Sequence, residues 1–231
     1  MMLDKLVAQR TGWSRRDAGR AIRRGRVTVD GHPVRQPRER VNESAAVALD
    51  GEPLVPPPRL LVWHKPPGVH CTVGDGLGRR NLESEVAELL TWQLHPVGRL
   101  DAPTSGLLLF ARDGAVTQHL LHPKREVPRT YRARVDPAPT PDLPSILAGG
   151  VATAAGVFTA EGVSLDGDVV TLTVREGKHR MVRRMLANAG HPVIDLARLA
   201  FGPFTLGELP SGAWREPMDD EVRWLEGRGL W

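Results

Sequence analysis

Hydrophobic residues recur at helical spacing in some segments of the chain and form short apolar or alternating runs in others. Leu3, Leu6 and Val7 predict a first helix, which Thr11-Gly12 ends. Further helices are predicted at residues 15–24, 81–90, 115–121 and 179–189. Strands are predicted at residues 27–29, 32–34, 60–64, 107–111, 131–135, 156–163 and 169–175.

Cap and turn residues support this division of the chain. Ser14 and Asp17 form a capping-box-like start for the second helix. The turn Asp166-Gly167 predicts a hairpin between the strands on either side of it. The Pro-rich residues 136–144 predict a surface loop. Because helices and strands do not alternate strictly, the pattern favours an α+β fold with a mainly antiparallel or mixed central sheet flanked by helices.

Positive charge is concentrated at the beginning of the chain. The 231 residues carry a formal net charge of +4, and residues 1–58 hold 11 Lys and Arg against 7 Asp and Glu, so the remainder is neutral. The run Pro56-Pro57-Pro58 is typical of a stiff linker. We therefore expect a small basic domain with its linker at residues 1–58 and a larger domain at residues 59–231.

The composition excludes several classes of protein. The single cysteine, Cys71, excludes a disulfide framework and a multi-thiolate zinc site. His95, His119 and His122 have no obvious fourth partner for a metal, so we expect no metal site. Because no apolar run approaches the roughly 20 residues of a membrane span, we expect a soluble, cytoplasmic protein.

One carboxylate stands on a loop just before a fully apolar run. Asp101 precedes the predicted strand at residues 107–111. An ionised carboxylate in such a place needs a cation or a solvated pocket, and Arg99 is a candidate partner. The spacing alone fits equally well an aspartate that caps its own loop, because Asp and Thr104 both form side-chain turns.

Four short motifs follow one another across most of the chain. They are Lys65-Pro66-Pro67-Gly68-Val69, then Gly98-Arg99-Leu100-Asp101 with Thr104-Ser105-Gly106-Leu107, then Arg129-Thr130-Tyr131-Arg132, and finally Gly177-Lys178-His179-Arg180-Met181-Val182-Arg183-Arg184-Met185. In these motifs the chain resembles the RsuA-like family of ribosomal RNA pseudouridine synthases, and the resemblance covers residues from about 60 to about 217.

The resemblance implies an isomerase that detaches uracil from C1′ of a uridine and rejoins it through C5, with no cofactor. It implies that Asp101 is the essential carboxylate and that Tyr131 lies in the active site, where a phenol can stack on uracil. Lys178, in the last motif, is our candidate for the cation that keeps Asp101 ionised. From the residues alone, Tyr131 also fits a strand aromatic of the core, and Lys178 also fits a surface lysine.

Substrate contacts are expected around this site, because a uridine inside folded RNA must leave its stack before an enzyme can reach it. At helical spacing Arg180, Arg183 and Arg184 share one face and are expected to touch RNA backbone, with a solvated basic helix as the alternative. Met181 stands where the family usually has glutamine, so any contact that this amide makes in the family, to RNA or to a loop, is missing here. Further candidates for substrate contact in the same motifs are Arg99, Thr104 and Lys65.

Residues 2 to about 50 resemble the small S4-type RNA-binding domain, whose helix pair and short strands carry this pattern. Arginines cover much of the surface opposite the apolar face of the predicted second helix. A solvated face is the alternative, but planar guanidinium groups bridge phosphate oxygens in pairs, which favours RNA contact. The candidates are Arg15, Arg16, Arg20, Arg23 and Arg24.

Together these patterns predict a monomeric two-domain enzyme that isomerises a specific uridine in ribosomal RNA. Its expected partner is ribosomal RNA, naked or within an assembling subunit, and no membrane is involved. A non-catalytic RNA-binding or ribosome-assembly factor of the same fold is the alternative, against which the presence of Asp101, Tyr131 and Lys178 argues. A nucleoside hydrolase is a further alternative, and it differs by releasing free base.

Overall fold

The computed structural model describes residues 1–74 and 76–231, which form two compact units. Unit 1 comprises Met1–Arg59 and Ala87–Leu94, and unit 2 comprises Leu60–Val86 and His95–Trp231. The division passes through α3 (Leu82–Thr91), whose helical geometry is interrupted at Val86. Unit 1 is therefore made of two separate stretches of sequence.

Two helices and a small antiparallel sheet make up unit 1. As predicted, α1 (Leu3–Thr11) ends at Gly12, and α2 (Arg15–Arg23) begins at Ser14, whose side chain accepts a hydrogen bond from the backbone N–H of Asp17. The sheet has the order β2-β1-β3-β4. Its strands are β1 (Val27–Val29), β2 (His32–Pro33), β3 (Val47–Leu49) and β4 (Glu52–Pro53), of which the hydrophobic pattern predicted the first two.

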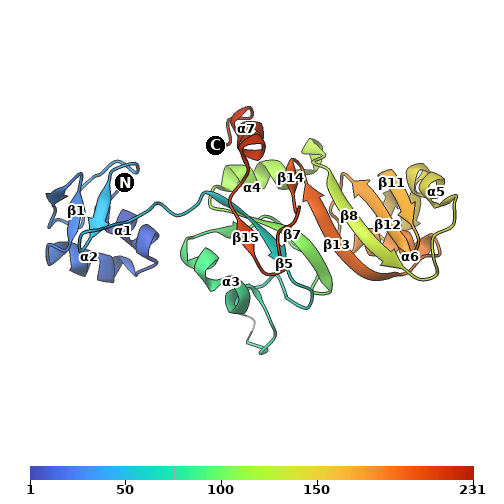
Figure 1. Cartoon of the computed structure of the whole chain (residues 1–231), viewed down its shortest axis with the longest axis horizontal. Helices are drawn as coiled ribbons and strands as arrows, with labels where there is room; N and C mark the ends of the chain where they lie inside the picture. Colours follow the sequence, from blue (N-terminus) through green and yellow to red (C-terminus); the bar gives the residue numbers. More distant parts are fainter. Residues whose placement is uncertain (75) are drawn as a thin grey trace. The chain divides into compact units, whose positions relative to one another are not determined.

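Unit 2 is built on a mixed sheet with the strand order β11-β12-β8-β13-β7-β5-β15 (Figure 1). Two short strands, β6 and β14, pair with β7 and β13. Among the described strand pairs, only β13 and β7 run parallel. The predicted α+β class with a mixed sheet is confirmed. The strands are β5 (Leu60–Lys65), β6 (His95–Pro96), β7 (Thr104–Ala111), β8 (Arg129–Val135), β11 (Glu161–Asp166), β12 (Val169–Val174), β13 (Val193–Phe201), β14 (Phe204–Thr205) and β15 (Trp214–Arg215).

Helices pack against this sheet and complete its core. Val116 and Leu120 of α4 (Gly114–Leu121) and Leu225 of α7 (Asp219–Glu226) join one apolar cluster with the β5 and β7 side chains. α6 (Met181–Asn188) contacts β13, and α5 (Leu143–Gly149) contacts β11. A 3₁₀ turn, η1 (Pro123–Arg125), follows α4, and the hairpin of β9 (Val151–Thr153) and β10 (Gly156–Phe158) follows α5.

The structure corrects several predicted elements. Residues 156–163 belong to two strands, because β10 pairs with β9 in a separate two-stranded sheet, whereas β11 pairs with β12 in the central sheet. The loop predicted at residues 136–144 ends at α5, whose first turn holds a proline, where helices tolerate one. β13 was not predicted, because bulges interrupt the alternation of its side chains. The predicted hairpin at Asp166-Gly167 is confirmed.

Candidate active site

A cavity of about 480 Å³ lies in unit 2, where the loops that precede β7 and α6 meet β8 and β13. Most of the residues that the sequence motifs single out line this cavity. They are Asp101, Tyr131, Lys178, Arg99, Thr104, Arg180 and Arg183. The described lining does not include Lys65 or Arg184.

One transverse row of the sheet runs beside the cavity and connects the motifs. Lys65 of β5 and Arg198 of β13 are both paired with Gly106 of β7, and Arg198 is also paired with Tyr131 of β8. Directly paired residues place their side chains on the same face of a sheet. Gly106 has a φ of 101°, and a Cβ atom there would lie 2.3 Å from the carbonyl oxygen of Arg198. Glycine is therefore required for β7 and β13 to approach this closely.

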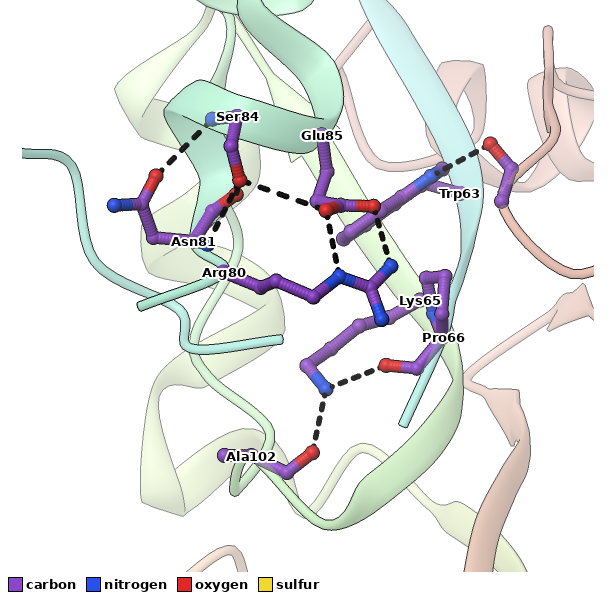
Figure 2. Close-up of polar contacts among 9 residues, drawn as sticks. Trp63, Lys65, Pro66, Arg80, Asn81, Ser84, Glu85 and Ala102 are labelled. Atoms are coloured by element: carbon purple, nitrogen blue, oxygen red, sulfur yellow. Dashed lines mark hydrogen bonds and ion pairs between the residues drawn. The ribbon is translucent and has the colours of Figure 1, made fainter. Parts of the chain in front are cut away.

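Lys65 anchors the Asp101 loop, residues 101–104, from β5. Its ammonium donates hydrogen bonds to the carbonyl oxygens of Pro66 (2.9 Å), Ala102 (3.2 Å) and Thr104 (2.8 Å), and Figure 2 shows the first two. Burial lowers the pKa of Lys65 to about 8, and Asp101 is among the nearby groups that oppose this lowering. The fully buried position of Lys65 does not fit the predicted contact with substrate.

Arg183 anchors the same loop from α6. Its Nη2 donates to the carbonyl oxygen of Pro103 (3.2 Å) and to the hydroxyl of Thr104 (3.3 Å), and its Nη1 donates to the carbonyl oxygen of Val193 (3.4 Å). Thr104 is only 2% exposed. The carbonyl oxygens of three consecutive residues, 102 to 104, are thus bound by two side-chain cations from distant parts of the sequence. In this structure Arg183 and Thr104 stabilise the loop.

The Asp101 carboxylate remains accessible on this anchored loop, with its side chain 26% exposed. A hydrogen bond from the Thr104 N–H to the Asp101 carbonyl oxygen (2.9 Å) closes the turn. His179 Nε2 lies 3.9 Å from Asp101 Oδ1, which is within ion-pairing distance when the imidazole is protonated. Lys178 is exposed and lines the cavity. Among the described ion pairs Asp101 has His179 as its partner, so the pairing of Asp101 with Lys178 stays a prediction.

Two buried arginines to which the sequence analysis assigned no role, Arg129 and Arg198, line the cavity beside Tyr131, which is 8% exposed. The guanidinium groups of Arg129 and Arg198 lie 4.6 and 5.0 Å from the ring centre of Phe201. Burial lowers the pKa of Arg129. The sequence did hold a signal for Arg129, because residues two apart on a strand share a face, and Arg129 is two positions before Tyr131.

The three arginines predicted to share a helical face do not do so. Arg180 precedes α6 and has a left-handed backbone, with a φ of 54°. Its side chain is exposed and lines the cavity, whereas Arg183 is half-buried behind the Asp101 loop. The helix predicted at residues 179–189 began too early, because His179 and Arg180 belong to the loop that precedes α6.

The five arginines predicted for RNA contact in unit 1 are all exposed. Arg15 pairs with Asp4 (2.8 Å) and Arg20 pairs with Asp17 (3.4 Å). A hollow of about 240 Å³ is lined by Arg20 and Arg24 together with Trp13 and Arg26. A second hollow, of about 520 Å³, is lined by Arg15, Arg16 and Arg23 together with Arg35 and Arg38. Analysis of a single helix missed Arg26, Arg35 and Arg38, which the fold brings to these hollows from other segments.

Among the residues that the structure describes, no group of three or more His, Cys, Asp or Glu side chains is placed to hold a metal ion. Within the same part of the chain, no helix is both long enough and apolar enough to cross a membrane.

Two family models match the chain. The model described as RNA pseudouridylate synthase matches residues 59–188, which include Asp101, Tyr131 and Lys178. The chain belongs to the RNA pseudouridylate synthase family. The S4 domain model matches residues 1–47. The family, the S4-type domain and the isomerase class predicted from the sequence are thereby confirmed.

Similarity to relatives extends over nearly the whole chain. An uncharacterized RNA pseudouridine synthase of Mycobacterium tuberculosis is 37% identical over 230 residues, which are 95% of this chain and 91% of the relative. Ribosomal small subunit pseudouridine synthase A of Escherichia coli is 34% identical over 228 residues, which are 96% of this chain and 98% of the relative. A crystal structure of a pseudouridylate synthase, 26% identical, matches with a TM-score of 0.66 and covers 96% of this chain and 98% of its own.

Proposed function

We propose that this chain isomerises one uridine of small-subunit ribosomal RNA to pseudouridine, with Asp101 as the essential carboxylate. The proposal rests mainly on one observation: the accessible carboxylate of Asp101, the phenol of Tyr131 and the amine of Lys178 line the same cavity. The choice of RNA is supported by the Escherichia coli relative, whose name assigns it to the small ribosomal subunit and whose length the chain covers almost completely.

In the proposed reaction the C1′–N1 bond breaks and uracil leaves with the electron pair of that bond. The Asp101 oxygen either bonds to C1′ and is displaced when C5 bonds there, or takes a proton from the sugar and returns it at the end. Tyr131 stacks on the base. The base turns within the cavity, C5 bonds to C1′, the C5 proton leaves and N1 takes up a proton. The product has the same atoms as the substrate, so the reaction consumes no co-reactant.

Exposed basic groups around the cavity fit an RNA substrate. Arg99, Lys178 and Arg180 line the cavity, and all three are exposed, so they are free to meet the phosphates of an everted nucleotide. The arginine-lined hollows of unit 1 offer further contacts to RNA backbone. We expect the enzyme to act as a monomer in the cytoplasm, on naked RNA or on an assembling subunit.

The decisive variant is Asp101→Asn, because it removes the charge and keeps the shape of the side chain. We expect it to abolish pseudouridine formation in small-subunit ribosomal RNA while RNA binding persists, as measured by mapping pseudouridines after incubation with purified enzyme. Asp113→Asn is the matched control. Asp113 caps α4 by accepting a hydrogen bond from the Ala115 N–H (2.8 Å), and asparagine caps helices equally well.

Other outcomes of this experiment separate the competing functions. Conversion by Asp101→Asn at the wild-type rate would contradict the role of Asp101. Binding without conversion by the wild-type chain would favour a non-catalytic RNA-binding factor, and accumulation of free uracil would favour a hydrolase. Comparison of modified positions in cells with and without the gene identifies the target uridine.

A further inference from the structure

Arg198 is a buried guanidinium whose hydrogen-bonding capacity is largely unused. Its side chain lines the cavity and is only 3% exposed. Nε donates to the carbonyl oxygen of Leu107 (2.8 Å), whereas Nη2 is buried without any partner among the described residues. Nearly all buried donors in native proteins are hydrogen-bonded, so an unpartnered one beside a cavity indicates a group that arrives with a ligand.

The neighbouring Arg129 differs from Arg198 in how its donors are used. Both guanidinium groups lie against the ring of Phe201, and both are buried. Arg129 uses its donors within the protein and binds three backbone carbonyl oxygens, those of Val127, Arg175 and Leu120. Arg129 therefore has a complete structural role, whereas Arg198 retains donors for another molecule.

The position of Arg198 in the sheet determines which part of a substrate it can meet. Arg198 is directly paired with Tyr131, so the two side chains lie next to each other on the same face. A uracil stacked on the Tyr131 ring presents its edge to groups beside that ring, and the polar atoms on the edge of uracil include two carbonyl oxygens, O2 and O4. The close approach of β13 to Gly106 also fixes Arg198 directly beside the strand that continues from the Asp101 loop.

We propose that Arg198 is a further catalytic residue, which donates a hydrogen bond to a carbonyl oxygen of uracil and stabilises the base while it is detached from the sugar. This proposal rests on the function proposed above. When the C1′–N1 bond breaks, its electron pair stays on the base, and conjugation spreads the negative charge over N1, O2 and O4. The charge disappears when C5 bonds to C1′, C5 loses its proton and N1 gains one. A fixed donor in a site that excludes water stabilises such a transient anion effectively.

The first test compares two methionine variants in the full-length chain. Arg198→Met is expected to lower kcat by ~10²–10³, as loss of an oxyanion donor does, with unchanged affinity for RNA. Its melting temperature is expected to stay close to that of the wild type, because the Leu107 carbonyl oxygen loses one donor while methionine fills the space and removes a buried, unpaired charge. Arg129→Met, the matched control, is expected to lower the melting temperature, because three carbonyl oxygens lose their donor. Arg198→Lys is expected to recover part of the lost kcat.

The second test changes the acceptor on the substrate. RNA with 2-thiouridine or 4-thiouridine at the target position carries sulfur, a weaker acceptor, in place of one carbonyl oxygen. We expect one of the two to slow the wild-type enzyme, and the same replacement to cause little further loss in Arg198→Met. Equal slowing of both enzymes would overturn the proposal. So would a loss of RNA affinity at unchanged kcat, which would place Arg198 on a phosphate.

Failure of the proposed function has different signs. Conversion by Asp101→Asn, or modification by the wild-type enzyme of an RNA other than small-subunit ribosomal RNA, would overturn that function. The Arg198 comparison is then made on the RNA that is modified. A wild-type chain that modifies no RNA overturns both proposals.

Discussion

At the scale of single residues, the environment of Lys65 links the stability of the protein to pH. The ammonium is fully buried, and its three hydrogen bonds all go to backbone carbonyl oxygens. Burial lowers its pKa from 10.5 to about 8. Below pH 8 the folded and unfolded chains both carry this proton. Between about 8 and 10.5 only the unfolded chain does, so this group makes the free energy of unfolding rise with pH in that window.

Lys65→Met is expected to remove this contribution. Denaturant titrations from neutral to alkaline pH should give a wild-type free energy of unfolding that rises, relative to the variant, between pH 8 and 10.5. Other alkaline titrations occur in both chains and cancel in the difference. Lys124→Met, at an exposed lysine, is the control and should follow the wild type. Parallel profiles for wild type and Lys65→Met would show that Lys65 keeps an ordinary pKa.

Residue type and spacing predicted which side chains gather at the cavity better than they predicted what each one does. Asp101, Tyr131 and Lys178 line the cavity as the motifs indicate. Lys65 and Arg183 carry the charge expected of substrate-binding residues, but they bind carbonyl oxygens of the Asp101 loop. Sequence spacing cannot reveal this, because the depth of a side chain depends on strands and helices that are distant in the sequence.

At the scale of elements, the parallel contact of β7 with β13 brings the Asp101 loop and Arg198 together. Thr104 to Gly106 of β7 pair with Leu196 to Arg198 of β13. Gly106 lies at the end of this pairing, and its missing side chain leaves room for the backbone of Arg198. The positions of the Asp101 loop and of Arg198 at the cavity therefore depend on one glycine.

Gly106→Ala is expected to separate the two strands. Because the added methyl group meets backbone atoms and the φ of 101° is unfavourable for alanine, we expect a loss of more than about 2 kcal/mol in the free energy of unfolding and a fall in kcat. Gly114→Ala is the matched control, because a Cβ atom there meets nothing within 4 Å. That change should alter stability by less than about 1 kcal/mol. Equal effects of the two changes in denaturant titrations would show that the strands adjust to alanine.

Helices and strands whose hydrophobic residues recur at regular spacing were predicted well. Those in which this spacing is interrupted were not. β12 and α4 follow their hydrophobic patterns closely. β13 lies at the centre of the sheet, yet it was missed because it carries Asp195 and Arg198 and two interruptions in its register. The irregular strand is the one that supplies Arg198 to the cavity.

At the scale of the whole molecule, the uneven charge of the chain has a measurable consequence for RNA binding. The excess of positive charge lies in residues 1–58, and arginines from α2 and from the following segments line two hollows of unit 1. Each phosphate neutralised by a protein cation releases counterions, so affinity falls with salt in proportion to the number of such contacts.

The combined variant Arg16→Gln, Arg23→Gln and Arg24→Gln is expected to bind ribosomal RNA more weakly and with less dependence on salt. These arginines are exposed, and no ion pair engages them among the described residues. The slope of log affinity against log salt should become shallower by up to about 3, with kcat at saturating enzyme unchanged. Arg223→Gln with Arg228→Gln, in and after α7, is the control. An unaltered slope in the triple variant would remove α2 from the RNA interface.

The overall class of the fold followed from the sequence because it depends on the order of elements, which patterns record well. The lack of strict alternation between strands and helices correctly indicated a mixed sheet. The sequence did not indicate which segments make up unit 1, because Ala87–Leu94 belongs to it although it lies within the sequence of the larger domain. A change in charge or a proline run marks the point where the chain leaves one unit for the next. It gives no sign of a later segment that returns to the first unit, as Ala87–Leu94 does.

The anchoring of residues 102 to 104 through backbone oxygens leaves the side chain at position 102 open to change. Every amino acid carries a carbonyl oxygen, so the bonds from Lys65 and Arg183 do not depend on which residue follows Asp101. Evolution, or a randomised library built at position 102, can thus diversify the rim next to the Asp101 carboxylate without removing its support. Such a site is a natural starting point for retargeting the enzyme to other uridines.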